Sequence, residues 1–114
     1  MIINLSNKKI LVHNSILCKT NQEKTIGLLK YNKMPNDTGL IFPNCKQIHS
    51  RKMKFSFQAI YLDKNLNVTG YNKNFEPGYV SKFRNNCIYV IEVPIGTIEK
   101  TNTKINDKII WKEQ

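Results

Sequence analysis

The clearest regularity in the chain is an alternation of apolar and polar side chains over residues 53–62. One face is apolar throughout and consists of Met53, Phe55, Phe57, Ala59 and Tyr61. The other face begins polar and turns apolar, in the order Lys54, Ser56, Gln58, Ile60 and Leu62. Because successive side chains of a strand point to opposite faces, this pattern predicts a β-strand that is half-exposed at first and then covered on both faces.

Further apolar runs, separated by turn-forming residues, predict more strands. Asp63-Lys64-Asn65 predicts a hairpin turn after the long strand, and the polar residues 72–86 predict a long loop or an irregular edge. With turn signals about every 8–12 residues, we expect one all-β domain over residues 1–114 (mainly β with one short helix), folded as a compact β-barrel or a jelly-roll-like sandwich. The additional predicted strands are residues 9–13, 16–18, 40–42, 66–71, 87–93 and 108–111.

One helix is predicted to begin after Thr20. The sequence Thr20-Asn21-Gln22-Glu23 has the form of a capping box, in which the threonine hydroxyl and the glutamate carboxylate satisfy free amides of the first turn. Gly27 weakens the helix that follows by about 1 kcal/mol, so we expect another element to pack closely against it. One or two helical turns are also predicted over residues 96–101.

The charge balance is strongly basic, with 18 Lys and Arg against 8 Asp and Glu, a formal net charge of +10. Such a chain attracts polyanions, and aromatic residues alternate with lysines at Phe55, Phe57 and Tyr61, so a nucleic-acid-binding β-barrel is one alternative function. However, 16 of the 18 cations are lysines, which read bases less well than arginines. Core aromatics that alternate with exposed lysines produce the same pattern.

No apolar run approaches the roughly 20 residues that a membrane-spanning helix needs, so no membrane span is expected. Residues 1–7 are too short and too polar for a secretory signal. From these features we expect a monomeric, cytoplasmic protein with reduced thiols.

The cysteines do not form a metal-binding or redox motif. Cys18, Cys45 and Cys87 include no CxxC pair, so no metal and no cofactor are expected. Cys18 and Cys87 lie in apolar runs and are predicted core residues. Cys45 lies near Lys46 and Lys52, whose charges would lower the pKa of the thiol and make it reactive; a partly buried loop cysteine is the alternative.

Four stretches, taken together and in this order, carry a family signature. The first two are Gly27-Leu28-Leu29 in the predicted helix and Gly39-Leu40-Ile41-Phe42-Pro43 in a predicted strand. The third comprises Cys45, Ile48-His49, Met53, Phe55 and Tyr61-Leu62-Asp63. The fourth is Val90-Ile91-Glu92-Val93-Pro94-Ile95-Gly96-Thr97, followed later by Asn106-Asp107. With these motifs, residues 10–111 resemble domain-of-unknown-function family 192.

The resemblance implies an all-β fold, similar to a small barrel or jelly roll, and no established reaction. The family usually has a proline and an aspartate in its central strand, where this chain has Ser56 and Gln58. If that aspartate were a catalytic acid in relatives, this chain would lack it. Relatives are often exported or tethered, whereas this chain is expected to have no leader.

Glu92 is the first candidate for chemistry. Strand alternation places it with Ile88 and Val90 on a face that we expect to be covered, and a buried carboxylate needs a partner or its pKa rises. One interpretation is a ligand-binding carboxylate at the mouth of the barrel. The other is a structural carboxylate that bonds loop amides or pairs with one of the nearby cations, which are His49, Arg51, Lys52 and Lys54.

His49 is the second candidate, either as a ligand-contacting or acid–base residue or as a histidine that bonds the loop backbone. We predict a binding or accessory domain whose pocket holds a small polar or anionic ligand or a peptide end, with no catalytic residue assigned. The alternative is an acid–base enzyme, a hydrolase or isomerase, in which Glu92 and His49 converge. The predicted ligand-contacting residues are His49, Arg51, Met53, Glu92 and Cys45.

Overall fold

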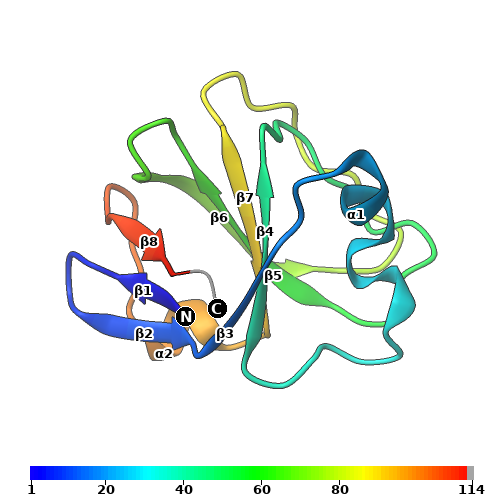
Figure 1. The fold of residues 1–114 in the computed structure, drawn as a ribbon, viewed down its shortest axis with the longest axis horizontal. Helices are drawn as coiled ribbons and strands as arrows, with labels where there is room; N and C mark the ends of the chain where they lie inside the picture. Colours follow the sequence, from blue (N-terminus) through cyan, green and yellow to red (C-terminus); the bar gives the residue numbers. More distant parts are fainter. Residues whose placement is uncertain (113–114) are drawn as a thin grey trace.

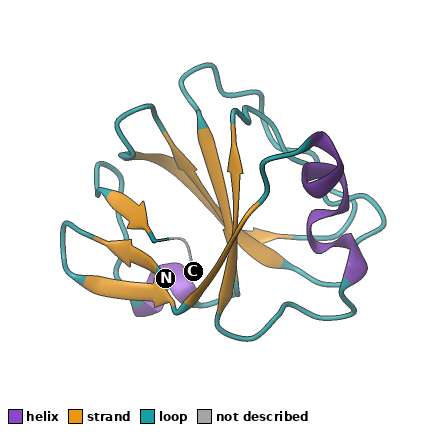
Figure 2. Ribbon diagram, in the orientation of Figure 1, coloured by secondary structure: helices purple, strands orange, loops and turns teal. Residues whose placement is uncertain are grey.

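The strands form two sheets, which Figure 1 shows side by side, and short helical segments lie on either side of the larger one (Figure 2). The computed structural model describes residues 1–112. The fold is mainly β, as predicted. Its elements, in chain order, are β1 (Ile2–Asn4), β2 (Lys9–Val12), β3 (Asn14–Leu17), α1 (Asn21–Ile26), the 3₁₀ helix η1 (Gly27–Lys30), β4 (Thr38–Pro43), β5 (Phe57–Leu62), β6 (Val68–Phe75), β7 (Tyr89–Val93), α2 (Thr97–Lys100) and β8 (Ile109–Trp111).

The strand β7 lies at the centre of the larger sheet, although it is the second-last strand of the chain. The larger sheet has the order β3-β4-β7-β5-β6, and in it only β3 and β4 run parallel. The smaller sheet has the order β2-β1-β8 and is antiparallel throughout. A side chain on β7 therefore has a hydrogen-bonded strand on each side and lies far from both edges of its sheet (Figure 1).

The larger sheet is covered on both faces. Ile60 and Leu62 of β5 pack with residues of the smaller sheet, whereas Phe57, Ala59 and Tyr61 belong to a second cluster beside α1 and η1. Every residue of β5 is buried, including Gln58, which was expected on a half-exposed face. Lys54 is exposed as expected, but it lies before the strand. Burying a large aliphatic or aromatic side chain contributes about 1.5–3 kcal/mol. Because such side chains are buried on both faces, two cores rather than one stabilise the sheet.

The strand predictions were correct for the apolar runs, but the closure of the sheet, strand β1 and the limits of β5 and β6 differ from the prediction. The expected closed barrel is absent from the described residues, which form two open sheets. Strand β1 lies in a segment for which no strand was predicted. The long strand begins at Phe57 rather than Met53, because residues 51–56 form turns with Lys52 in the left-handed region (φ 64°), and its partner β6 extends to Phe75.

Helix α1 begins as predicted. The Thr20 hydroxyl accepts a hydrogen bond from the Glu23 amide, and the Glu23 carboxylate accepts one from the Thr20 amide, each at 3.0 Å. Gly27 ends the helix at a φ of +40°, and a Cβ there would lie 3.3 Å from the Phe42 ring, which confirms the expected close packing. Among the described residues, no helix is long and apolar enough to cross a bilayer.

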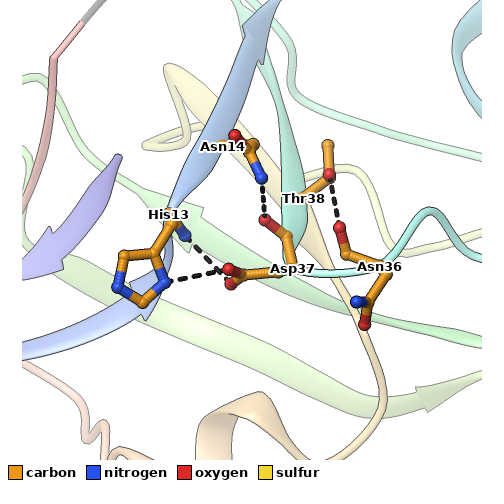
Figure 3. Close-up of polar contacts among 5 residues, drawn as sticks. All are labelled: His13, Asn14, Asn36, Asp37 and Thr38. Carbon is orange, nitrogen blue, oxygen red and sulfur yellow. Dashed lines mark hydrogen bonds and ion pairs between the residues drawn. The ribbon is translucent and has the colours of Figure 1, made fainter.

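A polar clasp joins the turn before β3 to the turn before β4 (Figure 3). The Asp37 carboxylate accepts a hydrogen bond from the His13 amide at 3.0 Å and lies 2.9 Å from His13 Nδ1. The Asn14 amide donates to the Asp37 carbonyl at 3.1 Å. The hydrogen bond from the His13 amide is the main reason that the pKa of Asp37 lies below its usual range. The clasp aligns β3 with β4, a parallel pair that no tight hairpin can produce.

Gln58 holds helix α2 against the larger sheet. Its Oε1 accepts a hydrogen bond from the Ile98 amide at 2.8 Å, and its Nε2 donates to the Lys73 carbonyl at 3.0 Å and to a Glu99 carboxylate oxygen at 2.8 Å. The Gln58 side chain is fully buried, on the face opposite to Ala59. Gln58, which departs from the pattern that the family resemblance implies, therefore has a structural role in this chain.

Replacing Gln58 with alanine is expected to destabilise the protein by about 2–4 kcal/mol, because it removes buried hydrogen bonds and leaves the Ile98 amide without its acceptor. Urea unfolding of the wild-type protein and of Gln58→Ala measures the difference. Gln22→Ala, at an exposed position of α1, is the matched control and should change stability by less than about 0.5 kcal/mol. Equal stabilities of the two variants would contradict this role.

Candidate functional site

A cavity of about 270 Å³ lies on the α1 side of the larger sheet. Helix α1 and η1 contribute residues 24–29 to its lining, β4 contributes Phe42, and the segment after β4 forms another wall. Helix α2 lies on the other side of the sheet and takes no part (Figure 2). The structure brings all of the predicted ligand-contacting residues to this cavity, namely Cys45, His49, Arg51, Met53 and Glu92.

Glu92 projects from the central strand β7 into the cavity. Its neighbours across the two strand pairs are Leu40 and Ala59, which are apolar and buried. Only 5% of Glu92 is exposed. The carboxyl group therefore lies in apolar surroundings in the middle of a sheet, and no barrel mouth surrounds it.

The structural partners expected for Glu92 are not in contact with it. Within residues 1–112, no cation lies within 4.0 Å of the carboxylate and no protein hydrogen bond reaches it. Burial without a partner disfavours the charged form and raises the pKa of Glu92 to about 8. At neutral pH the group is mainly a neutral carboxylic acid, which can both donate and accept a hydrogen bond.

The segment after β4 is held against the loop after β6 by buried hydrogen bonds. The Ile48 amide donates to the Ser81 hydroxyl at 3.0 Å, and the Ser81 amide donates to the Ile48 carbonyl at 2.9 Å. The Ser50 amide donates to the Tyr79 carbonyl and the Tyr79 amide donates to the Ser50 hydroxyl, each at 2.9 Å. The Ser50 hydroxyl donates in turn to the Glu76 carbonyl. These contacts give the wall a defined position.

His49 lies on the rim of the cavity, where its ring is exposed. Its backbone pairs with Val80 in an antiparallel bridge, and its Nδ1 accepts a hydrogen bond from the Arg51 amide at 3.2 Å. The interpretation in which His49 bonds the loop backbone is therefore confirmed. Because Nδ1 is an acceptor, the neutral ring carries its proton on Nε2, which leaves an N–H donor for a ligand.

The α1 wall was not identified from the sequence as part of the site. Lys24 and Leu28 line the cavity, and Lys24 adds a second cationic side chain to that of Arg51. The capping box predicted the helix, but it did not indicate which strand the helix covers. The close contact between Gly27 and Phe42 is what places this wall over the sheet.

Cys45 differs from the reactive thiol expected from the neighbouring lysines. The Lys46 ammonium donates to the carbonyls of Asn85 at 2.7 Å and Cys87 at 3.0 Å instead of stabilising a thiolate. Burial raises the pKa of the Cys45 thiol, and the charge of Glu92 adds to the effect. The alternative, a partly buried loop cysteine, is confirmed.

The aromatic stripe is also part of the core. Phe57 and Tyr61 are fully buried, so these two rings are not exposed to stack on bases as the nucleic-acid alternative requires, and Phe55 is partly buried against the same cluster. Within the described residues, no group of three or more His, Cys, Asp and Glu side chains is placed to hold a metal ion. The cavity offers apolar walls, a buried carboxyl group at its base and cationic side chains at its rim.

The chain belongs to DUF192, the domain-of-unknown-function family 192. The model of this family, described as "Uncharacterized ACR", matches residues 2–111. The family resemblance predicted from the sequence motifs is thereby confirmed. No curated protein matches the chain.

Two solved structures share the fold. A protein of unknown function from Novosphingobium aromaticivorans DSM 12444 is 21% identical with a TM-score of 0.75, covering 85% of this chain and 74% of that one. A protein from Sinorhizobium meliloti 1021, provisionally described as a transcription regulator, is 16% identical with a TM-score of 0.79, covering 96% of this chain and 88% of that one. At these identities the likeness extends to the fold alone.

The raised pKa of Glu92 makes a prediction about stability. Between about pH 5 and pH 8 the folded protein retains a proton that the unfolded chain has released, so stability should fall as pH rises, by up to about 1.4 kcal/mol per pH unit. Glu92→Gln removes this titration, so its stability relative to the wild type should increase over the same range. Urea unfolding at about pH 5.5, 6.5, 7.5 and 8.5 measures both slopes.

Glu76→Gln is the matched control, because it makes the same change at an exposed glutamate that does not line the cavity. This variant should keep the wild-type pH dependence. Parallel stability curves for the wild type and Glu92→Gln would show that the Glu92 carboxyl is not held in its neutral form.

The thiol of Cys45 is expected to react slowly with iodoacetamide at about pH 7.5, more slowly than glutathione, because its raised pKa leaves little thiolate. Cys18 and Cys87 are buried as predicted, and burial raises the pKa of each to about 11, so they should react only on unfolding. Mass spectrometry of the intact and digested protein measures each rate. A Cys45 rate above that of glutathione would restore the reactive-thiol interpretation.

Proposed function

We propose that this protein binds a small molecule in the cavity above Glu92 and acts as a binding or accessory protein. The observation that carries the proposal is the carboxyl group of Glu92, a residue that is 5% exposed; the group lines a cavity and has no partner among the described residues. A buried polar group without a partner costs about 1–3 kcal/mol or more. A ligand that bonds this group would remove that cost, whereas an inert scaffold gains nothing from it.

The lining defines what such a ligand looks like. Apolar side chains such as Leu28, Phe42 and Ile48 would contact its body, while the cavity offers a polar partner only at its base and its rim. The cavity, of about 270 Å³, has room for a small molecule. Lys24 and Arg51 at the rim favour a ligand with an anionic group at its outer end.

An acid–base enzyme is the second candidate. A pKa of about 8 suits a group that gives or takes a proton near neutral pH, and the imidazole of His49 lines the same cavity. Conversion of a bound compound by the wild type but not by Glu92→Gln would favour this candidate over the binding protein.

The proposal predicts that a subset of small metabolites raises the melting temperature of the wild-type protein. A ligand at about ten times its Kd stabilises by about 1.4 kcal/mol, which corresponds to several degrees for a domain of this size. Glu92→Leu and Arg51→Gln should lose most of the shift, because Leu removes both the donor and the acceptor of the Glu92 carboxyl and Gln removes the charge of Arg51. Thermal-shift screening, followed by ligand-observed NMR, makes the measurement.

Glu76→Gln serves again as the control and should respond to each compound as the wild type does. A screen of amines, acids, amides, sugars and short peptides that finds no compound with this dependence on Glu92 would overturn the proposed function. Shifts confined to peptides would replace the small molecule with a peptide end.

A further inference from the structure

The base of the cavity points to the charge of the group that enters it. Glu92 has apolar neighbours on both flanking strands, Leu40 and Ala59, and no protein cation within 4.0 Å among residues 1–112. Attraction between opposite charges is strongest where water is excluded, so an ammonium group gains more from this carboxyl than a neutral hydrogen-bonding group does. An anionic group gains no such attraction, because no protein cation lies beside the carboxyl group to pair with it.

The walls point to what connects that group to the exterior. Leu28, Phe42, Ile48 and Met53 surround the space above the carboxyl and offer aliphatic and aromatic surface. A polymethylene stem fits such walls, because aliphatic stems of charged side chains commonly pack on apolar surface while their charged ends reach a polar partner. Two charged ends separated by an apolar stem therefore match a carboxyl base and a cationic rim.

The rim points to the charge at the other end. Lys24 of α1 and Arg51 of the opposite wall both line the cavity, and the Nε2–H of His49 adds a donor. These groups repel a second ammonium and attract a carboxylate or phosphate. When Glu92 is ionised, the charge of the lining side chains thus changes from negative at the base of the cavity to positive at its rim.

Building on the proposed binding function, we propose that the ligand is an ω-amino acid or a similar zwitterion. Its ammonium group pairs with Glu92, its apolar stem lies between α1 and the segment after β4, and its anionic group meets Arg51 and Lys24. A compound such as 6-aminohexanoate carries these three parts: an ammonium group, an aliphatic stem and a carboxylate.

This pairing carries a proton signature. An ammonium ligand requires Glu92 to ionise, so binding near pH 7 releases up to one proton, and affinity rises with pH until Glu92 is ionised in the free protein. The other titratable or charged groups around Glu92 are Cys18 before α1, Lys24 on α1, and Cys45, His49 and Arg51 on the segment after β4. The flanking strands add only apolar neighbours. A ligand that hydrogen-bonds the neutral acid releases no proton from Glu92 and loses affinity as pH rises.

The test uses a set of six-carbon probes that differ only in their ends: 6-aminohexanoate, hexylamine, hexanoate, hexanamide and 1,6-diaminohexane, with shorter and longer ω-amino acids to vary the stem. Titration calorimetry at about pH 7, in two buffers of different ionisation enthalpy, measures affinity and proton release. We expect 6-aminohexanoate to bind at least about tenfold more tightly than hexanoate and hexanamide. The affinity of hexylamine should lie between that of 6-aminohexanoate and those of hexanoate and hexanamide. The diamine should bind more weakly than hexylamine.

The variants separate the two ends of the ligand. Glu92→Gln should weaken 6-aminohexanoate at least about tenfold and abolish proton release, Arg51→Gln should reduce its advantage over hexylamine, and Glu76→Gln should change neither. Tighter binding of hexanoate or hexanamide, with dependence on Glu92, would overturn the zwitterion and leave the proposed binding function intact. Failure of every ω-amino acid to bind would also overturn the zwitterion. The binding function itself would be overturned only if the metabolite screen failed too.

Discussion

The burial of the Glu92 carboxyl group is the physical constraint on which the candidate site depends. The group lies on the central strand of a sheet that is covered on both faces, with apolar neighbours on each side. Burial weakens the solvation of its charged form, so the pKa of the group is raised to about 8 and ionising it costs the folded protein stability. The packing that stabilises the sheet is therefore the same packing that makes Glu92 available to a ligand as an unpaired, poorly solvated partner.

Two close contacts allow the sheet to be covered in this way. A Cβ at Gly39 would lie 2.6 Å from the Ile2 side chain, so glycine lets the smaller sheet approach β4. On the other face, Gly27 lets the end of α1 approach Phe42 and thereby forms one wall of the cavity. The opposite wall depends on buried Ser50 and Ser81, whose hydroxyls bond the backbone of the facing loop. The cavity exists because its two walls are held separately rather than packed on each other.

The two faces of the larger sheet divide structural and candidate functional roles. Gln58 faces α2 and has its polar atoms bonded within the protein, whereas Glu92 on the adjacent strand faces the cavity and has no protein partner among the described residues. The departure from the family pattern at position 58 therefore does not remove a group from this cavity. The two solved structures share the fold at low identity and carry no established function to transfer, so the chemistry must be argued from this chain's own residues.

The local pattern determined the capping box at Thr20, the apolar strands and the buried cysteines, because these depend on neighbours a few residues apart. The candidate residues between Cys45 and Met53 came from the stretches that resemble the family. The local pattern also indicated a covered carboxyl at Glu92, since strand alternation places that residue on an apolar face. Tertiary structure decided that the sheets stay open, that β1 joins the smaller sheet, that Lys46 turns away from Cys45 and that Glu92 has no cation beside it. These features depend on which strands pair and which loops meet, and a period-two pattern specifies the faces of a strand but not its neighbours.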